Sequence, residues 1–271
     1  MPDPRPTQVT VPGVRATKRR DGHPPLVMVT AYDTPGARIA DAAGVDMILV
    51  GDSVATNVLG YENNLQVTVA DMAHHTAAVA RARPKPLIVA DLPWMSYHLD
   101  PVDTVRNGAT LIRAGAQAVK LEGGVNRVPM IEALVAAEIP VMGHLGLTPQ
   151  SINAMGGYRV QGRDDAAAHA LTLAAKAISA AGCFALVIEG VPERVGAAIT
   201  ESLDVPTIGI GAGPDCDGQV LVFHDLLGFS ATVPKFVRRY AQLEEEAVAG
   251  VAAYAADVRS GAFPADAEVY H

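Results

Sequence analysis

Residues 87–124 read LIVADLPWMSYHLDPVDTVRNGATLIRAGAQAVKLEGG and contain one complete strand–helix–strand unit. The runs at 87–93 and 118–124 are rich in Val, Ile and Leu with little alternation, which is typical of parallel strands covered by helices. Between them, Asp100 stands directly before Pro101, and a capping residue followed by proline marks the first turn of a helix. This stretch therefore predicts two neighbouring parallel strands joined by a helix.

The same pattern extends outward over most of the chain. Apolar runs of strand length recur at 26–32, 47–52, 87–93, 118–124, 141–147, 185–191, 206–212 and 219–225. Nearly every run is followed by a helix-start signal. Thr68 with Asp71, for example, forms a near capping box, and Thr34 before Pro35 repeats the cap-then-proline arrangement. Strand-then-helix repeated eight times predicts the α/β class and a closed (β/α)8 TIM barrel in a single domain.

A doubly wound sheet is the competing arrangement. It would need fewer strands or a second domain, and residues 33–36 (DTPG) do not match the glycine pattern that opens a dinucleotide-binding unit. The 271 residues fit one barrel. We expect an N-terminal arm over residues 1–25, the catalytic barrel over 26–243 and a helical C-terminal tail over 244–271.

Composition narrows the class of protein. Hydrophobic residues make up 49% of the chain, which excludes a disordered protein, and no apolar run approaches the roughly 18 residues of a membrane span. The net charge of −8, with one short basic cluster at 18–20, argues against nucleic acids and anionic membranes as partners. Cys183 and Cys216 are too few for a disulfide framework or a zinc site, which favours the reduced cytoplasm. We expect small-molecule substrates.

Charged residues stand where the predicted strands end. In a barrel of this kind the active site lies at those ends, and reading them in order gives Asp52, Asp91, Lys120 with Glu122, His144 and Glu189. Each has an ordinary structural interpretation: the aspartates as turn formers, the lysine and glutamate as an ion pair, the histidine as a core residue, Glu189 as a turn residue. Burying so many ionisable groups together is costly unless they are paired or bind a ligand, so their convergence favours an active site.

The residue types indicate the chemistry. Two aspartates and a glutamate offer hard oxygen ligands, which suit Mg²⁺ better than zinc. Lys120 and Glu122 are two apart on a strand, so both side chains point into the barrel, where the lysine can meet a substrate carboxylate. Glu189, two strands on, is a candidate base. Trp94, Met95 and Tyr97 predict a lid or a pocket wall, or a subunit contact.

Eight segments of the chain carry a family resemblance. They are VTAYD, GDSVATNVLGY, TVADMAHHTAAVARA, VADLPWMSY, RAGAQAVKLEGG, IPVMGHLGLTPQSINAMGGYRVQGR, LVIEGVP and TIGIGAGPDCDGQVLVFHDLLG. Together they resemble the ketopantoate hydroxymethyltransferase family from about Val29 to Phe236, and KLEGG and GHLGLTPQS are its most specific motifs. Trp94 replaces a common phenylalanine, and the loop at 60–66 differs in detail.

The resemblance implies a reaction and a site. The reaction is the transfer of a hydroxymethyl unit from 5,10-methylenetetrahydrofolate to 3-methyl-2-oxobutanoate through a Mg²⁺-stabilised enolate, giving 2-dehydropantoate for pantothenate and coenzyme A. It implies a (β/α)8 barrel and a homo-oligomer, commonly a decamer. The implied residues are Asp52, Asp91 and Glu122 for Mg²⁺; Asp52, Ser53, Asp91 and Lys120 for the keto acid; Glu189 as proton acceptor; and His144 in a supporting role.

Two other functions remain open at this point. One is a lyase or phosphonomutase of the isocitrate lyase and phosphoenolpyruvate mutase type, which shares the barrel; the cysteine-bearing loop typical of the lyases is absent from the sequence. The other is a non-catalytic barrel that binds a keto acid. That protein would be expected to have lost part of the ligand set, which is complete here.

Overall fold

Eight parallel strands close into a barrel in which each strand pairs with its neighbour in sequence and the last pairs with the first. The fold is that of a computed structural model, which describes residues 8–271. The strands are β1 Leu26–Thr30, β2 Met47–Val50, β3 Leu87–Asp91, β4 Ala118–Glu122, β5 Val141–Gly146, β6 Ala185–Glu189, β7 Thr207–Ile210 and β8 Gly218–Leu221. The predicted (β/α)8 TIM barrel is confirmed, and the doubly wound sheet is excluded.

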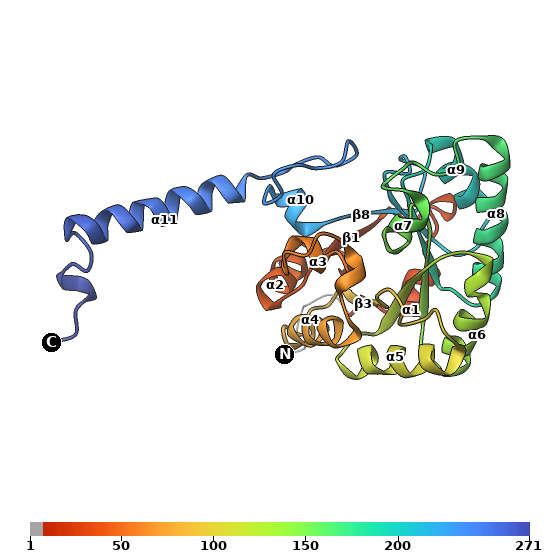
Figure 1. The fold of residues 1–271 in the computed structure, drawn as a ribbon, viewed down its shortest axis with the longest axis horizontal. Helices are drawn as coiled ribbons and strands as arrows, with labels where there is room; N and C mark the ends of the chain where they lie inside the picture. The colour runs from red at the N-terminus through yellow and green to blue at the C-terminus, as the bar shows by residue number, and fades with distance from the viewer. Residues whose placement is uncertain (1–7) are drawn as a thin grey trace. The chain divides into compact units, whose positions relative to one another are not determined.

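Helices cover the outside of the barrel (Figure 1). The longer ones are α2 Thr34–Ala42, α4 Val69–Arg81, α5 Pro101–Arg113, α6 Val128–Ala136, α8 Asp165–Ala180 and α9 Glu193–Glu201. Shorter helices occupy the connections: α1 Val11–Arg15, α3 Val54–Asn57, α7 Ile152–Met155 and α10 Phe223–Leu227, with 3-10 turns η1 Arg19–Asp21, η2 Asn64–Gln66, η3 Val125–Arg127, η4 Pro149–Ser151 and η5 Asp266–Glu268. The capping signals at Thr68 with Asp71 and at Asp100 are confirmed, because both accept the hydrogen bonds of an N-cap.

Three details differ from the sequence prediction. The cap of α2 is Asp33, whose side chain accepts from Gly36 N, so Thr34 is already the first helical residue. The last predicted strand, 219–225, ends at Leu221, and Phe223 begins a helix. In the described chain no helix separates β7 from β8, since only residues 211–217 connect them. The strand count was therefore predicted correctly, but the eightfold strand–helix alternation was wrong at this connection.

Alternate positions along each strand face the barrel interior, as the two-residue period of a strand requires. Near the N-terminal ends they are apolar and form one core cluster that includes Met28, Met47, Leu87, Ala118 and Met142. Continuing along the same strands at this period, the inward positions near the C-terminal ends become polar or charged, as at Asp91 and Lys120. The barrel thus has an apolar floor and a charged mouth.

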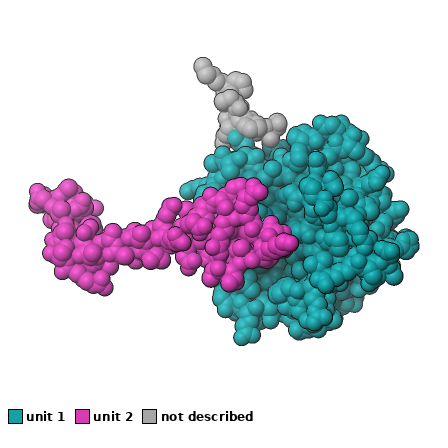
Figure 2. Space-filling model, turned by 90° about the horizontal axis from the view of Figure 1, so that it is seen from above, with its two compact units in different colours: residues 1–223 teal, residues 224–271 magenta. Residues whose placement is uncertain are grey.

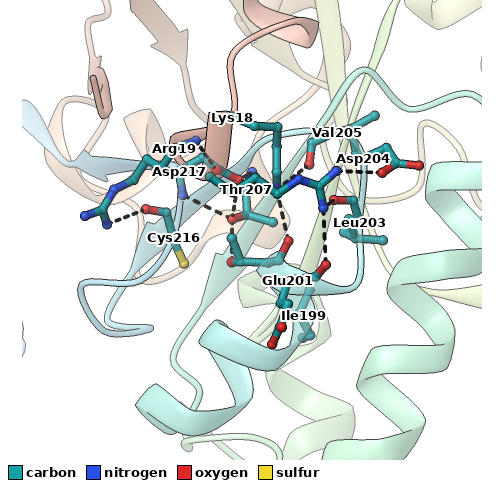
Figure 3. A network of polar contacts seen from close by, with 12 residues as sticks. Lys18, Arg19, Ile199, Glu201, Leu203, Asp204, Val205, Thr207, Cys216 and Asp217 are labelled. Carbon is teal, nitrogen blue, oxygen red and sulfur yellow. Dashed lines mark hydrogen bonds and ion pairs between the residues drawn. The ribbon is translucent and has the colours of Figure 1, made fainter. Parts of the chain in front are cut away.

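The N-terminal segment packs against the apolar floor. Val14 of α1 is buried within the core cluster, with Val9 and Val11 packed against it. Beyond α1, Lys18 Nζ lies 2.7 Å from Asp217 Oδ2 in an ion pair with almost no solvent exposure (Figure 3). The same ammonium donates to the carbonyl oxygens of Thr200 and Val205. Arg19 donates to the carbonyl oxygen of Cys216 and Arg20 to that of Leu203, so the basic cluster at 18–20 is engaged within the chain, with the end of α9 and the loops that precede β7 and β8.

The chain divides into two compact units, residues 1–223 and 224–271 (Figure 2). The first contains the barrel. The second contains α11 Leu243–Ser260, an 18-residue helix that has no buried residue. The expected boundaries at 25/26 and 243/244 stay predictions, and residues 1–7 of the expected arm lie outside the described residues. Within residues 8–271, no helix combines the length and apolar character needed to cross a bilayer.

Candidate active site

The strand-end residues identified in the sequence line one pocket. The cavity has a volume of about 100 Å³. Its wall includes Asp52, Ser53, Asp91, Lys120, Glu122, His144 and Glu189. Leu49, Val187 and Val220 supply apolar surface to the same pocket. The volume suits a small organic acid, and the arrangement of a few charged groups on an apolar base is typical of a small-molecule site.

Strand register brings these side chains together. Asp91 at the end of β3 pairs with Lys120 on β4, and Glu122 at the end of β4 pairs with His144 on β5. Asp52 follows β2 by two residues, and its backbone N–H donates to Asp91 Oδ2 at 3.0 Å. Because parallel strands end at the same edge of the barrel, consecutive strands place one functional group beside the next.

Lys120 is the central cation of the pocket. Its Nζ lies 2.9 Å from Asp91 Oδ1 and 3.1 Å from His144 Nδ1. Burial works against the charged form, but Asp91, Glu122 and Asp52 outweigh it and raise the pKa of Lys120 above its ordinary value. The lysine is therefore a fixed ammonium group whose charge is directed into the pocket.

His144 lies between the lysine and two carboxylates. Its Nδ1 is 3.4 Å from Glu122 Oε1, and its Nε2 is 3.2 Å from Glu189 Oε2. Burial and Lys120 lower the pKa of His144, but Glu122 and Glu189 outweigh them and raise it to about 9. In the imidazolium both nitrogens carry protons; in a neutral ring that accepts from Lys120 at Nδ1, the proton is on Nε2. In either state a protonated Nε2 faces Glu189.

The pocket carries excess negative charge on the side of Asp52 and Asp91. Burial, followed by repulsion from Asp91 and Glu122, raises the pKa of Asp52 well above its ordinary value. Burial also raises the pKa of Asp91, although Lys120 opposes the shift. For Glu122, His144 and Lys120 outweigh burial and lower the pKa. A cation bound beside Asp52 and Asp91 would relieve this repulsion.

The donor chemistry of this side fits Mg²⁺. Carboxylate oxygens are its preferred protein ligands, and Mg²⁺ commonly takes one or two of them together with water and substrate oxygens. Within residues 8–271, no group of three or more His, Cys, Asp or Glu side chains is spaced to hold a metal ion by itself. The full ligand set of Asp52, Asp91 and Glu122 therefore stays a prediction.

Ser53, next to Asp52, belongs to a chain of hydroxyl groups. The Thr30 hydroxyl donates to Tyr32 OH at 3.0 Å, and Tyr32 OH lies 2.8 Å from Ser53 Oγ. The backbone N–H of Phe223 donates to Thr30 Oγ1 at 2.9 Å, which directs the Thr30 proton toward Tyr32. Ser53 is thus held at the pocket wall by Tyr32, two residues after β1, and Thr30 at the end of β1 supports Tyr32 in turn.

Three functional candidates were missed or misjudged from the sequence. Asn64 and Gln150 both donate to the Asp52 carboxylate, and neither stands at a strand end. Tyr97 was expected in a lid or pocket wall; its hydroxyl is instead buried, accepting from Glu122 N and donating to Gln150 Oε1. Trp94 and Met95 are exposed. The one sequence feature that could have indicated Gln150 is its position within the specific GHLGLTPQS motif.

His98 gives a pH-dependent prediction next to this network. Its ring packs against Tyr97, and burial followed by the Arg127 charge lowers the pKa of His98 to about 4. The unfolded chain takes up a proton near pH 6.5, whereas the folded chain does so only near pH 4, so stability falls as the pH drops through this window. We expect His98→Gln to lessen the loss of unfolding free energy between pH 6.5 and 4, measured by urea denaturation. Parallel curves for both proteins would contradict this.

Sequence comparisons agree with the geometry of the pocket. A family model described as ketopantoate hydroxymethyltransferase matches residues 8–266. A 3-methyl-2-oxobutanoate hydroxymethyltransferase of Methylobacterium sp. (strain 4-46) is 58% identical over 90% of this chain and 85% of its own. The enzyme of the same name from Moorella thermoacetica (strain ATCC 39073 / JCM 9320) is 55% identical over 95% of this chain and 96% of its own.

Solved structures that resemble the chain are much more distant in sequence. A 2,3-dimethylmalate lyase of the PEP mutase/isocitrate lyase superfamily superposes with a TM-score of 0.61 at 19% identity, covering 98% of this chain and 93% of that one. A phosphonopyruvate hydrolase in complex with oxalate and Mg²⁺ gives 0.59 at 15% identity, covering 96% and 91%. These likenesses establish a shared fold alone. With the family model spanning nearly its whole length and relatives above 50% identity, the chain belongs to the ketopantoate hydroxymethyltransferase family.

Proposed function

We propose that this enzyme transfers a hydroxymethyl unit from 5,10-methylenetetrahydrofolate to 3-methyl-2-oxobutanoate, giving 2-dehydropantoate. The observation that carries the proposal is one buried pocket that joins Asp52, Asp91, Lys120, Glu122 and Glu189, in a chain 58% identical to a 3-methyl-2-oxobutanoate hydroxymethyltransferase. Its product would serve pantothenate and coenzyme A synthesis.

The chemical difficulty is that the C3–H of the keto acid is barely acidic. We propose Asp52, Asp91 and Glu122 as the residues that hold Mg²⁺, which supplies Lewis-acid stabilisation of negative charge on the substrate oxygens. Lys120, fixed against Asp91 at 2.9 Å, adds a preorganised positive charge near the same oxygens. Ser53 and Asp52, adjacent at the pocket wall, would contact the keto acid together with Asp91 and Lys120.

Glu189 is the residue we assign to proton removal. It ends β6 and retains partial solvent exposure. β6 lies across the barrel from β2, which Asp52 follows by two residues. His144 Nε2, 3.2 Å from Glu189 Oε2, would orient the base. The carbon nucleophile produced by this step would then form a C–C bond to the methylene carbon of the folate. Water would supply the hydroxyl group as the bonds from that carbon to the folate nitrogens break, and tetrahydrofolate would leave.

Metal removal gives a direct prediction. Dialysis against a chelator is expected to abolish product formation, and added Mg²⁺ to restore it, because excess negative charge beside Asp52 would otherwise oppose binding of an anionic keto acid. Initial rates before and after each treatment measure the effect, with mock-dialysed protein as the control. Full activity after rigorous metal removal would contradict the Mg²⁺ assignment.

Location and assembly complete the proposal. We place the enzyme in the cytoplasm, where its substrates would be made and where its two cysteines, both free and buried, would stay reduced. We also propose a homo-oligomer, with a decamer as the expected size, and small molecules as its ligands. Light scattering of the purified protein would measure the subunit number.

The test of the reaction is product formation. Incubation with 3-methyl-2-oxobutanoate, Mg²⁺ and 5,10-methylenetetrahydrofolate should give the hydroxymethylated acid by mass spectrometry, and omission of the folate should prevent it. A lyase or phosphonomutase would act on other substrates without folate, and a keto-acid-binding barrel would bind the acid and leave it unchanged. Either result would overturn the proposed reaction.

A further inference from the structure

The carboxylate of Asp52 is held on both oxygens by side-chain amides. Asn64 Nδ2 donates to Oδ1 and Gln150 Nε2 donates to Oδ2, each at 2.8 Å. All three residues are buried. Removing a hydrogen-bond donor from a buried carboxylate costs free energy. These two bonds therefore fix the plane of the Asp52 carboxylate.

The amide of Gln150 has only one favourable orientation. Its Nε2 also donates to the carbonyl oxygen of Leu92 at 3.0 Å, while its Oε1 accepts from Tyr97 OH at 2.5 Å. A flipped amide would set its oxygen against two acceptors, Leu92 O and Asp52 Oδ2. Tyr97 OH accepts from Glu122 N at 3.1 Å, so its own proton is directed to Gln150.

Gln150 also reaches the second acidic residue of the pocket. Its backbone N–H donates to Glu122 Oε2 at 3.0 Å. One residue of η4, in the connection after β5, therefore contacts a carboxylate from the end of β4 and another that follows β2. Asn64 comes from η2 in the connection after β2, and η2 and η4 pack against each other. The two loops together hold Asp52 in place.

Neutral amides suit this task for an electrostatic reason. A lysine or arginine at either position would pair with Asp52 and cancel the charge that a cation needs. An amide orients the carboxylate without adding a charge of its own, and each carboxylate oxygen keeps a second lone pair for a ligand.

We propose that Asn64 and Gln150 form an amide clamp, a pair of positioning residues that orients Asp52 for the Mg²⁺–keto-acid complex. The clamp rests on the proposed function, and it assigns a role to two residues outside the strand ends. Mutation of a residue that orients a metal ligand in this way commonly lowers metal affinity or activity by about 10–100-fold.

The test measures binding as well as turnover. Calorimetric titration with Mg²⁺ in the presence of 3-methyl-2-oxobutanoate should show about 10–100-fold weaker binding for Gln150→Met and for Asn64→Leu. Gln150→Leu also removes the donor to Asp52 without adding a charge, so it should weaken binding in the same way if the methionine variant folds poorly. The double variant should lose less than the product of the single losses, because both amides act on one carboxylate.

Gln117→Met is the matched control. Gln117 Oε1 accepts from Ile88 N at the opposite end of the barrel, so its replacement also removes a hydrogen bond to a side-chain amide, but far from the pocket. It should lower the melting temperature and leave binding unchanged. Binding within twofold of the unmodified protein in Gln150→Leu and Asn64→Leu would overturn the clamp. If the unmodified protein itself binds no Mg²⁺, the proposed function fails and the clamp with it.

Discussion

Replacing Glu189 by glutamine is expected to lower kcat by about 10²–10⁴-fold, the usual worth of a general base. Glutamine keeps the size of the side chain but cannot accept the C3 proton. Keto-acid binding should stay nearly normal, because the proposed binding groups Asp52, Asp91 and Lys120 are untouched. Steady-state rates, with binding followed by calorimetry, measure the two effects separately.

Glu193→Gln provides the control for this prediction. Glu193 lies four residues further on, at the start of α9, and is exposed. The same chemical change there should leave kcat unaltered. A Glu189→Gln variant that retained more than a tenth of normal turnover would remove this residue from the role of base.

Replacing Lys18 by methionine is expected to lower the free energy of unfolding by about 3–5 kcal/mol, the range for removing one partner of a buried ion pair. Lys18 and Asp217 are both almost fully buried, so the variant would leave a carboxylate without its cation beneath the barrel (Figure 3). Urea denaturation at pH 7 measures the loss.

Two further variants separate this effect from a general loss of surface charge. Arg20→Met breaks an exposed pair with Asp204, which solvent screens, so it should cost much less stability than Lys18→Met. Lys18→Met combined with Asp217→Asn should recover much of the stability, since no unpaired charge remains. Equal losses of unfolding free energy in Lys18→Met and Arg20→Met would show that the buried ion pair stabilises the fold no more than the exposed pair does.

The barrel could be predicted because eight largely apolar runs of strand length recur along the chain, and most of them are followed by a helix-start signal. The predicted end of the last strand was wrong because one apolar run spans two elements. Val220 and Leu221 belong to β8, but the run continues into Phe223, which begins α10. The absence of a helix between β7 and β8 could not be predicted, because the glycine-rich segment 211–217 is compatible with either a turn or the start of a helix.

The charged mouth of the pocket could be predicted for a different reason. Lys120 lies within the apolar β4, and Glu122 and Glu189 end β4 and β6. Burying a charged side chain is costly unless it is paired or binds a ligand, so these positions indicate a functional site. Asn64 and Gln150 carry no such signal, because neutral amides in loops are common. Their importance depends on the folding of two separate connections over Asp52, and that arrangement appears only in three dimensions.

The most direct test of the account is exchange of the C3 proton of 3-methyl-2-oxobutanoate in D₂O, without folate, followed by proton NMR. Exchange isolates the step assigned to the pocket, because it requires C–H cleavage and no one-carbon donor. The account predicts that enzyme with Mg²⁺ replaces this proton with deuterium, that chelator stops the exchange, and that Glu189→Gln does not support it. Exchange that continued undiminished in Glu189→Gln, or none at all in active unmodified enzyme, would contradict it.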